Sequence, residues 1–250
     1  MNAPAVRSRE QMSPADAAWL QMEHPANRMI ITALLLFDGP LEAGALQRTL
    51  ERVAALPRFH HRVISPSFLP GLPEWRDDPR FDLRAHLHHL AVPAPGGDAG
   101  LQQLVSERMS AELPLSKALW EVDVIDRGGG ASALLLRVHH CIGDGIALVS
   151  ALLGLADEPG AVPPDLGKRR ERWSGPLAWA GQRLARARTL AQLLALPEDP
   201  PTPFRGPVGV AKRAAWSMPI PLARLRALAR EHHATMNDVM MGTLAGVLRD

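Results

Sequence analysis

The chain has 250 residues, enough for one large domain or two small ones, and its 46% hydrophobic content argues against disorder of the bulk of the chain. The formal net charge is +2, and seven basic residues with one acid cluster between Lys168 and Arg188, which argues against nucleic-acid binding by the protein as a whole. The single cysteine, Cys141, leaves no intrachain disulfide and fits a reducing compartment, while 23 prolines argue against a long helical bundle.

Neither a membrane span nor a signal peptide is visible in the sequence. The longest nearly apolar and uncharged run, Gly145 to Ala156, is well short of the roughly 20 residues that a spanning helix needs. The first ten residues are polar, carry Arg7 and Arg9, and have no apolar run behind them. We therefore expect a cytoplasmic protein that at most rests on a membrane surface.

The first elements of the chain are two helices and a strand between them. Residues 12–23 predict a helix, because Pro14 suits its first position. The continuous apolar run 29–37 predicts a strand buried on both faces. Residues 41–56 have helical spacing of their apolar side chains, and Pro57 is expected to end that helix.

Five short elements follow before the most distinctive motif. They are strands at 62–64 and 74–76, a helix at 101–113, and strands at 121–125 and 133–139. The last two strands are expected to form a hairpin, because Arg127 to Gly130 is a turn sequence.

The C-terminal part of the chain is divided by proline-rich segments. Its predicted elements are helices at 146–155 and 173–196, a strand at 213–218, and helices at 221–232 and 237–249. A Pro/Gly/Asp-rich segment at 157–166 is the clearest boundary, and five prolines in 197–207 predict an extended crossover. We therefore divide the chain into an N-terminal domain at 1–156, a linker with a crossover helix at 157–207, and the start of a second domain at 208–250.

The sequence HHCIGDG at 139–145 is the strongest signal for chemistry. It lies where a buried strand ends in a tight turn before a helix, and functional residues concentrate at such junctions. Neighbouring residues on a strand point to opposite faces, so only one of His139 and His140 can face a cleft. The other ring and Asp144 are then expected to support it.

One imidazole at a cleft predicts general-base catalysis, since its pKa of about 6.5 suits removal of a proton from a hydroxyl at neutral pH. A metal site is disfavoured, because two rings on opposite faces do not easily reach one ion and no CxxC or HExxH is present. A serine triad is disfavoured because GxSxG is absent and Cys141 lies beside His140. The alternative for the histidine pair is a hydrogen-bonded structural role, which we prefer for His60-His61 and His88-His89; His232-His233 is interpreted as surface.

The motif and four further segments resemble the bacterial wax ester synthase/diacylglycerol acyltransferase family of the CoA-dependent acyltransferase superfamily. The further segments are MSPADA at 12–17 with Glu23, Pro114-Leu115 with Leu119-Trp120-Glu121, PVG at 207–209 and ATMNDV at 234–239. They extend over nearly the whole chain, although Ala118 stands where the family usually has a proline. Condensation domains of peptide synthetases share HHxxxDG, but MSPADA and NDV point away from them.

The resemblance implies an α/β fold like that of chloramphenicol acetyltransferase, with a mixed sheet flanked by helices. It implies that His140 is the general base that deprotonates a long-chain alcohol or the free hydroxyl of a diacylglycerol. The resulting oxygen nucleophile would attack the thioester of a fatty acyl-CoA. Acyl-CoA is then a substrate, and neither a metal, a bound cofactor nor a covalent enzyme intermediate is expected.

Supporting roles are implied for other motif residues. His139 would support the site, Asp144 would hold the turn through an ion pair, and Gly145 would let the backbone bend. Asn237 and Asp238 would help to organise the cleft.

The resemblance also implies a second domain of similar size, with the cleft between the two. The chain is therefore expected to be an N-terminal fragment that lacks this domain, is poorly active alone and exposes an apolar face. Three functions stay open: this O-acyltransferase, a condensation-type transacylase acting on carrier-protein thioesters, and a non-catalytic lipid-binding half-domain. The basic segment 174–196 is either an amphipathic helix on an anionic membrane or a crossover helix packed on the core.

Overall fold

The computed structural model describes residues 9–65, 71–143, 195 and 206–249. The chain divides into two compact units, one up to Arg213 and one from Ala214 onward, and each is described by itself. The predicted elements at 146–155, 157–166 and 173–196, and most of the crossover 197–207, lie outside the described residues.

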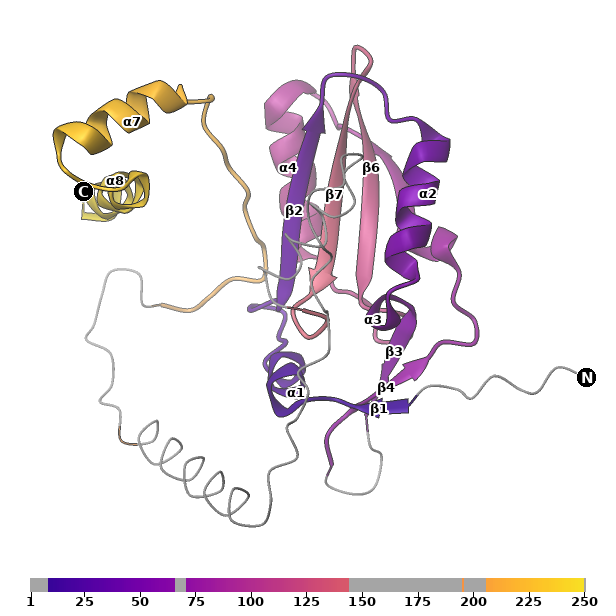
Figure 1. Cartoon of the computed structure of the whole chain (residues 1–250). Helices are drawn as coiled ribbons and strands as arrows, with labels where there is room; N and C mark the ends of the chain where they lie inside the picture. Colours follow the sequence, from indigo (N-terminus) through magenta and orange to yellow (C-terminus); the bar gives the residue numbers. More distant parts are fainter. Residues whose placement is uncertain (1–8, 66–70, 144–194, 196–205, 250) are drawn as a thin grey trace, which may run out of the picture. The chain divides into compact units, whose positions relative to one another are not determined.

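A four-stranded mixed sheet forms the framework of the first unit (Figure 1). Its strands, in spatial order, are β2 (Ile30–Phe37), β7 (Ala131–His139), β6 (Trp120–Gly128) and β5 (Leu87–Ala91). Strand β5 runs parallel to β6, whereas the β2–β7 and β7–β6 pairs are antiparallel. The predicted hairpin is therefore confirmed, and the predicted mixed sheet with it.

The turn of the β6–β7 hairpin depends on glycine. Gly128, Gly129 and Gly130 have φ angles of 79°, 63° and 85°, a region that side chains with a Cβ rarely adopt. Because the turn is specified by three consecutive glycines, the hairpin could be predicted from the local sequence.

A second, smaller sheet has the order β1 (Arg9–Gln11), β4 (Glu74–Asp77), β3 (His61–Ile64). Both pairings are antiparallel, and His61 lies directly opposite Asp77 in the register of β3 and β4. The two short strands predicted at 62–64 and 74–76 are confirmed.

Helices α2 (Ala43–Ala54) and α4 (Gly97–Ser110) flank the larger sheet (Figure 1). The remaining helices of this unit are α1 (Pro14–Gln21), α3 (Pro57–His60) and the 3-10 helix η1 (Leu83–His86). Helix α1 begins as its sequence indicates, because the Ser13 hydroxyl accepts a hydrogen bond from the Asp16 N–H at 3.1 Å.

Helix α4 differs from its prediction, since it begins at Gly97 and ends at Ser110 rather than spanning 101–113. Its C-cap residue Ala111 is extended, and the Ala111 carbonyl accepts a hydrogen bond from the Arg137 side chain. The helix therefore ends four residues before Pro114, where a side chain from a distant strand contacts the Ala111 carbonyl.

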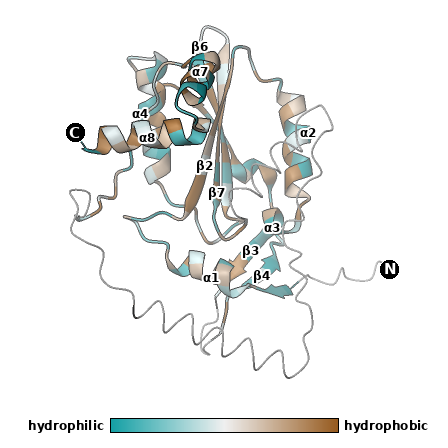
Figure 2. Ribbon diagram, turned by 60° about the vertical axis from the view of Figure 1, so that its left-hand side comes forward, coloured by the Kyte–Doolittle hydropathy of each residue, from teal (hydrophilic) through white to brown (hydrophobic). Residues whose placement is uncertain are grey.

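The prediction that 29–37 is buried on both faces is wrong. Strand β2 lies at one edge of the larger sheet as described, none of its residues is fully buried, and Leu35 and Leu36 are 40% and 50% exposed. Figure 2 shows β2 coloured as hydrophobic along much of its length. An apolar run indicates a preference for burial, but it does not show which other elements cover the two faces of the strand.

The core of the first unit lies between the two sheets and helices α1 and α2. It is centred on the fully buried indoles of Trp75 and Trp120 and includes Cys141 and Ile142, which directly follow the histidine pair. The turn that carries the motif is therefore anchored in the core.

The second unit contains α7 (Leu222–Glu231) and α8 (Met236–Arg249), which confirm the two predicted C-terminal helices. The strand predicted at 213–218 is wrong, since no strand forms there. Alternating side chains suit a strand, but a strand also needs another one beside it. None of the helices in the described part of the chain has the length and apolarity that crossing a bilayer requires.

Candidate functional site

Strand β7 delivers two histidines to a tight turn. His139 is its last residue, and His140 begins the turn that continues through Cys141 and Ile142. The Ile142 N–H donates to the His139 carbonyl at 3.0 Å, and the His140 N–H donates to the Met29 carbonyl at 2.7 Å. The predicted placement of the pair at a strand tip is confirmed.

His139 is the enclosed member of the pair, with 2% of its surface exposed. Its Nδ1 accepts a hydrogen bond from the Cys141 N–H at 3.1 Å, so the proton of the neutral ring is on Nε2, 3.7 Å from a Glu23 carboxylate oxygen. Burial lowers the pKa of His139, and His140 lowers it further, against the opposing effect of Glu23. A neutral, fixed ring fits the supporting role expected for it.

His140 is only half-buried, and its ring stacks on the indole of Trp19 from α1. The ring centroids are 4.0 Å apart and the planes are inclined by 21°. Among the described residues, no group forms a hydrogen bond with Nδ1 of His140. The ring is therefore held by stacking, and its Nδ1 is a buried atom without a hydrogen-bond partner in the described part of the chain.

Arg58 of α3 also holds the turn. Its Nη1 donates to the carbonyls of Cys141 and Ile142 at 3.4 and 3.1 Å, and its Nη2 pairs with Asp16 at 3.1 Å. The guanidinium also lies 5.6 Å from the centre of the Trp75 ring. Sequence reasoning missed Arg58, and the one sequence signal connected with it is its partner Asp16, which belongs to the MSPADA segment.

Glu23 ties the motif segment after α1 to both β2 and the histidine pair. One carboxylate oxygen pairs with Arg28 at 3.0 Å, and the other accepts the Met29 N–H at 2.5 Å. The second oxygen is also the one that faces His139. The position of Glu23 in the family signature thus has a structural counterpart in this fold.

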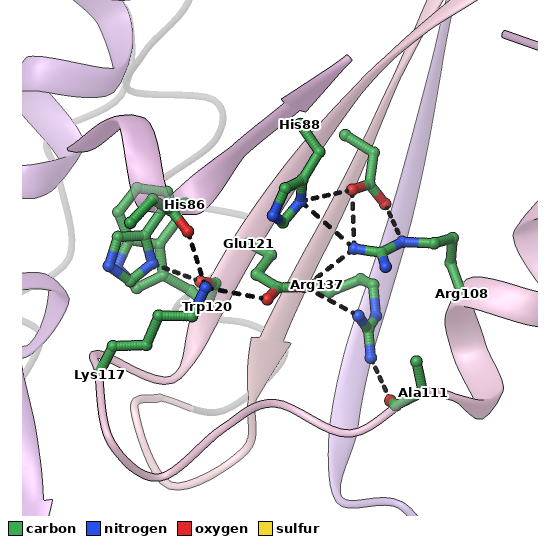
Figure 3. A network of polar contacts seen from close by, with 10 residues as sticks. His86, His88, Arg108, Ala111, Lys117, Trp120, Glu121 and Arg137 are labelled. Atoms are coloured by element: carbon green, nitrogen blue, oxygen red, sulfur yellow. Dashed lines mark hydrogen bonds and ion pairs between the residues drawn. The ribbon is translucent and has the colours of Figure 1, made fainter. Parts of the chain in front are cut away.

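A network of charged residues stiffens the hairpin that carries the site (Figure 3). Arg137 is completely buried and donates to Glu121 at 3.0 Å, and Glu121 also pairs with Arg108 at 2.9 Å and Lys117 at 3.2 Å. Arg108 pairs with Asp123 at 2.7 Å as well. Buried charges persist only with such partners, so the network fixes β6 against β7.

Cys141 is fully buried, and burial raises the pKa of its thiol far above its ordinary value. A thiol held in the protonated form is a poor nucleophile. Cys141 is therefore a small side chain packed in the core.

The described structure does not place the remaining predicted site residues relative to the histidine pair. Asp144 and Gly145 are outside the described residues. Asn237 and Asp238 are in the second unit, at the start of α8, and both are exposed. Asp238 accepts the Thr235 N–H at 2.8 Å while the Thr235 hydroxyl accepts the Asp238 N–H at 3.1 Å, a reciprocal cap of the helix.

The other histidine pairs have mostly structural contacts. The Nδ1 atoms of His60 and His88 lie 3.0 Å from the Ala54 carbonyl and from Asp123, and the Nε2 of His61 lies 2.9 Å from Asp77. His89 is exposed. His232 and His233 are exposed after α7, as predicted.

Comparison with known proteins places these features in a family context. Residues 12–176 match the sequence model of the wax ester synthase/diacylglycerol acyltransferase catalytic domain. A putative diacylglycerol O-acyltransferase of Mycobacterium tuberculosis (strain CDC 1551 / Oshkosh) is 30% identical over 280 residues, covering 99% of this chain and 56% of that protein. A probable diacylglycerol O-acyltransferase of the same strain is 28% identical over 263 residues, covering 96% of this chain and 57% of that protein.

Solved structures of related proteins have a similar fold. The wax ester synthase/diacylglycerol acyltransferase from Marinobacter aquaeolei VT8 superposes with a TM-score of 0.65 at 26% identity, covering 96% of this chain and 60% of that one. The first condensation domain of the CDA synthetase superposes with a TM-score of 0.62 at 21% identity, covering 96% of this chain and 61% of that one, which shows a shared fold. The expected acyltransferase-type fold is confirmed, and the chain spans a little over half the length of these relatives.

Proposed function

The chain belongs to the wax ester synthase/diacylglycerol acyltransferase family, and on that basis we propose that it carries the catalytic histidine for transfer of a fatty acyl group from acyl-CoA to a hydroxyl. The acceptor we propose is a diacylglycerol or a long-chain alcohol. The observation that carries the proposal is the contrast between the two histidines. His139 is enclosed and hydrogen-bonded, whereas His140 is half-buried and stacked on Trp19, with Nδ1 unused by the described residues.

His140 acts as the general base in this proposal. It takes the proton from the acceptor hydroxyl as the oxygen attacks the thioester carbonyl carbon, so that an ester bond forms. The carbon–sulfur bond then breaks, and the imidazolium returns its proton to the departing CoA sulfur. General-base catalysis of this kind contributes typically about 10²–10⁴-fold to the rate.

The other residues of the motif act on His140 or on the turn. His139, as a neutral ring, accepts the Cys141 N–H and so supports the turn at the end of β7. Asp144 holds the turn through an ion pair and Gly145 allows the backbone to bend, as the family resemblance implies. Asn237 and Asp238 help to organise the cleft, as the family resemblance implies. These four assignments rest on the matched motifs.

The basic segment 174–196 is a crossover helix packed on the core or, because the proposed substrates are lipids, an amphipathic helix that contacts a membrane surface. Flotation with neutral and with anionic liposomes separates the two. Stronger flotation with anionic liposomes would support membrane contact, and equal flotation would exclude it. The condensation-type alternative is supported by the shared fold alone.

The test uses the protein at its full encoded length, with radiolabelled palmitoyl-CoA and either a diacylglycerol or hexadecanol as acceptor. His140→Ala is expected to abolish labelled ester formation, while the matched control His89→Ala, at an exposed histidine, is expected to retain it. Ester formation that survives His140→Ala would remove His140 from the mechanism. Transfer to a carrier-protein thioester in place of either lipid would favour the condensation-type reaction.

A further inference from the structure

A second cluster of histidines lies outside the strand-tip site. His60 is the last residue of α3, His61 is the first residue of β3, and Asp77 is the last residue of β4. Each offers one potential metal-binding atom, and these three atoms lie within 4.8 Å of one another. The cluster is built by the small sheet, because the register of β3 and β4 sets His61 directly opposite Asp77.

The distances in the cluster suit a single bound ion. Oδ1 of Asp77 lies 2.9 Å from Nε2 of His61 and 3.6 Å from Nε2 of His60. Zinc–nitrogen and zinc–oxygen bonds of about 2.0–2.2 Å in a tetrahedron hold neighbouring ligand atoms about 3.4 Å apart. The two observed distances lie on either side of that value, so small side-chain rotations would bring the atoms around one ion.

The hydrogen bond on the far side of the His60 ring sets its tautomer. Nδ1 of His60 lies 3.0 Å from the Ala54 carbonyl oxygen, which can only accept, so Nδ1 carries the proton. In the neutral ring, the lone pair of Nε2 then points toward the Asp77 carboxylate, an arrangement that repels unless a proton or a cation lies between them. A ring N–H on a backbone carbonyl is also the usual support of a metal-binding histidine.

His61 already contacts Asp77 directly. Its Nε2 lies at hydrogen-bond distance, 2.9 Å, from Oδ1 of Asp77, so a bound ion would replace the proton that lies between these two atoms. Asp77, and Glu10 on β1, also bring negative charge near His61.

We propose that His60, His61 and Asp77 bind one divalent transition-metal ion, best matched by Zn²⁺. Two imidazole nitrogens and one carboxylate oxygen are common zinc ligands, and water or another donor completes the tetrahedron. The ion would join the end of α3 to the edge of the small sheet, two residues from Arg58, which holds the strand-tip turn. This site does not depend on the proposed acyl transfer, and it departs from our sequence-based expectation of a purely hydrogen-bonded role for His60-His61 and no metal.

The test is titration of chelator-treated full-length protein with Zn²⁺ by calorimetry, together with the visible absorption of bound Co²⁺. One ion per chain is expected to bind at this site, with an intense visible Co²⁺ band of the tetrahedral type. Zn²⁺ is also expected to raise the melting temperature, because it binds the folded state. His60→Gln and Asp77→Asn are each expected to weaken binding by at least about tenfold and to abolish the Zn²⁺-dependent rise in melting temperature.

The matched control is the double variant His232→Gln/His233→Gln, which removes two consecutive, exposed histidines of the second unit. It should bind the ion as the unchanged protein does. Melting curves in chelator show whether each variant is folded. Absence of stoichiometric binding to the unchanged protein would overturn the proposal. Binding lost in the control but kept in both cluster variants would also overturn it, and would assign the metal to the exposed pair.

Discussion

The imidazole of His140 lies against the indole of Trp19, with ring centroids 4.0 Å apart and planes inclined by 21°. When His140 takes a proton, the ring becomes a cation over the electron-rich face of an indole. Such contacts contribute about 0.5–2 kcal/mol, depending on how far the pair is desolvated. In the proposed mechanism, Trp19 therefore positions the ring of His140 and lies against its protonated form.

This relationship predicts that Trp19→Leu lowers kcat by about 2- to 30-fold with little effect on KM, the rate equivalent of losing that contact. Trp19→Phe should retain most of the activity, because it keeps an aromatic face. Steady-state kinetics with palmitoyl-CoA and saturating acceptor measures both. An unchanged kcat in Trp19→Leu would show that the stack has no part in the reaction.

The strand tip could be predicted because its signals are local. The glycine turn and the alternating strand pattern near it place His139 and His140 without any knowledge of the rest of the chain. Edge placement of β2 and the early end of α4 could not be predicted in this way. The edge position of β2 depends on how strands far apart in the chain pair, and the end of α4 involves Arg137, which donates to the Ala111 carbonyl.

The same limit applies to the site itself. Arg58 contacts the turn from 83 and 84 residues away, and arginines are too common in this sequence for one of them to stand out. The sequence shows His60 and His61 as a pair, but only the register of β3 and β4 brings Asp77 beside them. A spacing pattern in the sequence does not reveal a third ligand that a strand pairing supplies.

Arg58 is expected to control the position of the motif turn. Its planar guanidinium reaches the two turn carbonyls and Asp16 together, a geometry that a lysine ammonium does not reproduce. We expect Arg58→Lys to lower the free energy of unfolding by about 1–3 kcal/mol and to reduce kcat. Urea denaturation and initial rates give the two values.

The matched control for Arg58 is Arg48, an exposed arginine whose contact with Glu42 is 3.7 Å long. Arg48→Lys should change neither the unfolding free energy nor the rate, since exposed ion pairs contribute little. If the two lysine variants behaved alike, the contacts of Arg58 with the turn would have no special role.

The buried network predicts unequal effects of removing its two central members. Glu121→Gln leaves the completely buried Arg137 without its carboxylate, and an uncompensated buried charge costs about 3–5 kcal/mol. Arg137→Met leaves Glu121 with Arg108 and Lys117, so it should cost less. Urea unfolding of both variants is the measurement, and equal losses would contradict this division of partners.

Stability is expected to fall as the pH decreases from 7.5 to 5. Burial lowers the pKa of His61, His86 and His139 in the folded protein, so the unfolded chain, with histidine pKa values of about 6.5, binds more protons in this range. Below the pKa that it has in the unfolded chain, each such histidine lowers the free energy of unfolding by up to about 1.4 kcal/mol per pH unit. This continues until the ring is protonated in the folded protein as well. Carboxylates titrate mostly below this window.

His86 allows the pH effect to be assigned. It is 1% exposed and its Nδ1 lies 2.8 Å from the Trp120 carbonyl, which fixes a neutral tautomer against the core. His86→Gln should reduce the slope of unfolding free energy against pH between 5 and 6.5, whatever its effect on stability at pH 7.5. His89→Gln, at an exposed ring, should leave the slope unchanged. A slope that persists in full in His86→Gln would mean that this buried ring takes up its proton as easily in the folded chain as in the unfolded one.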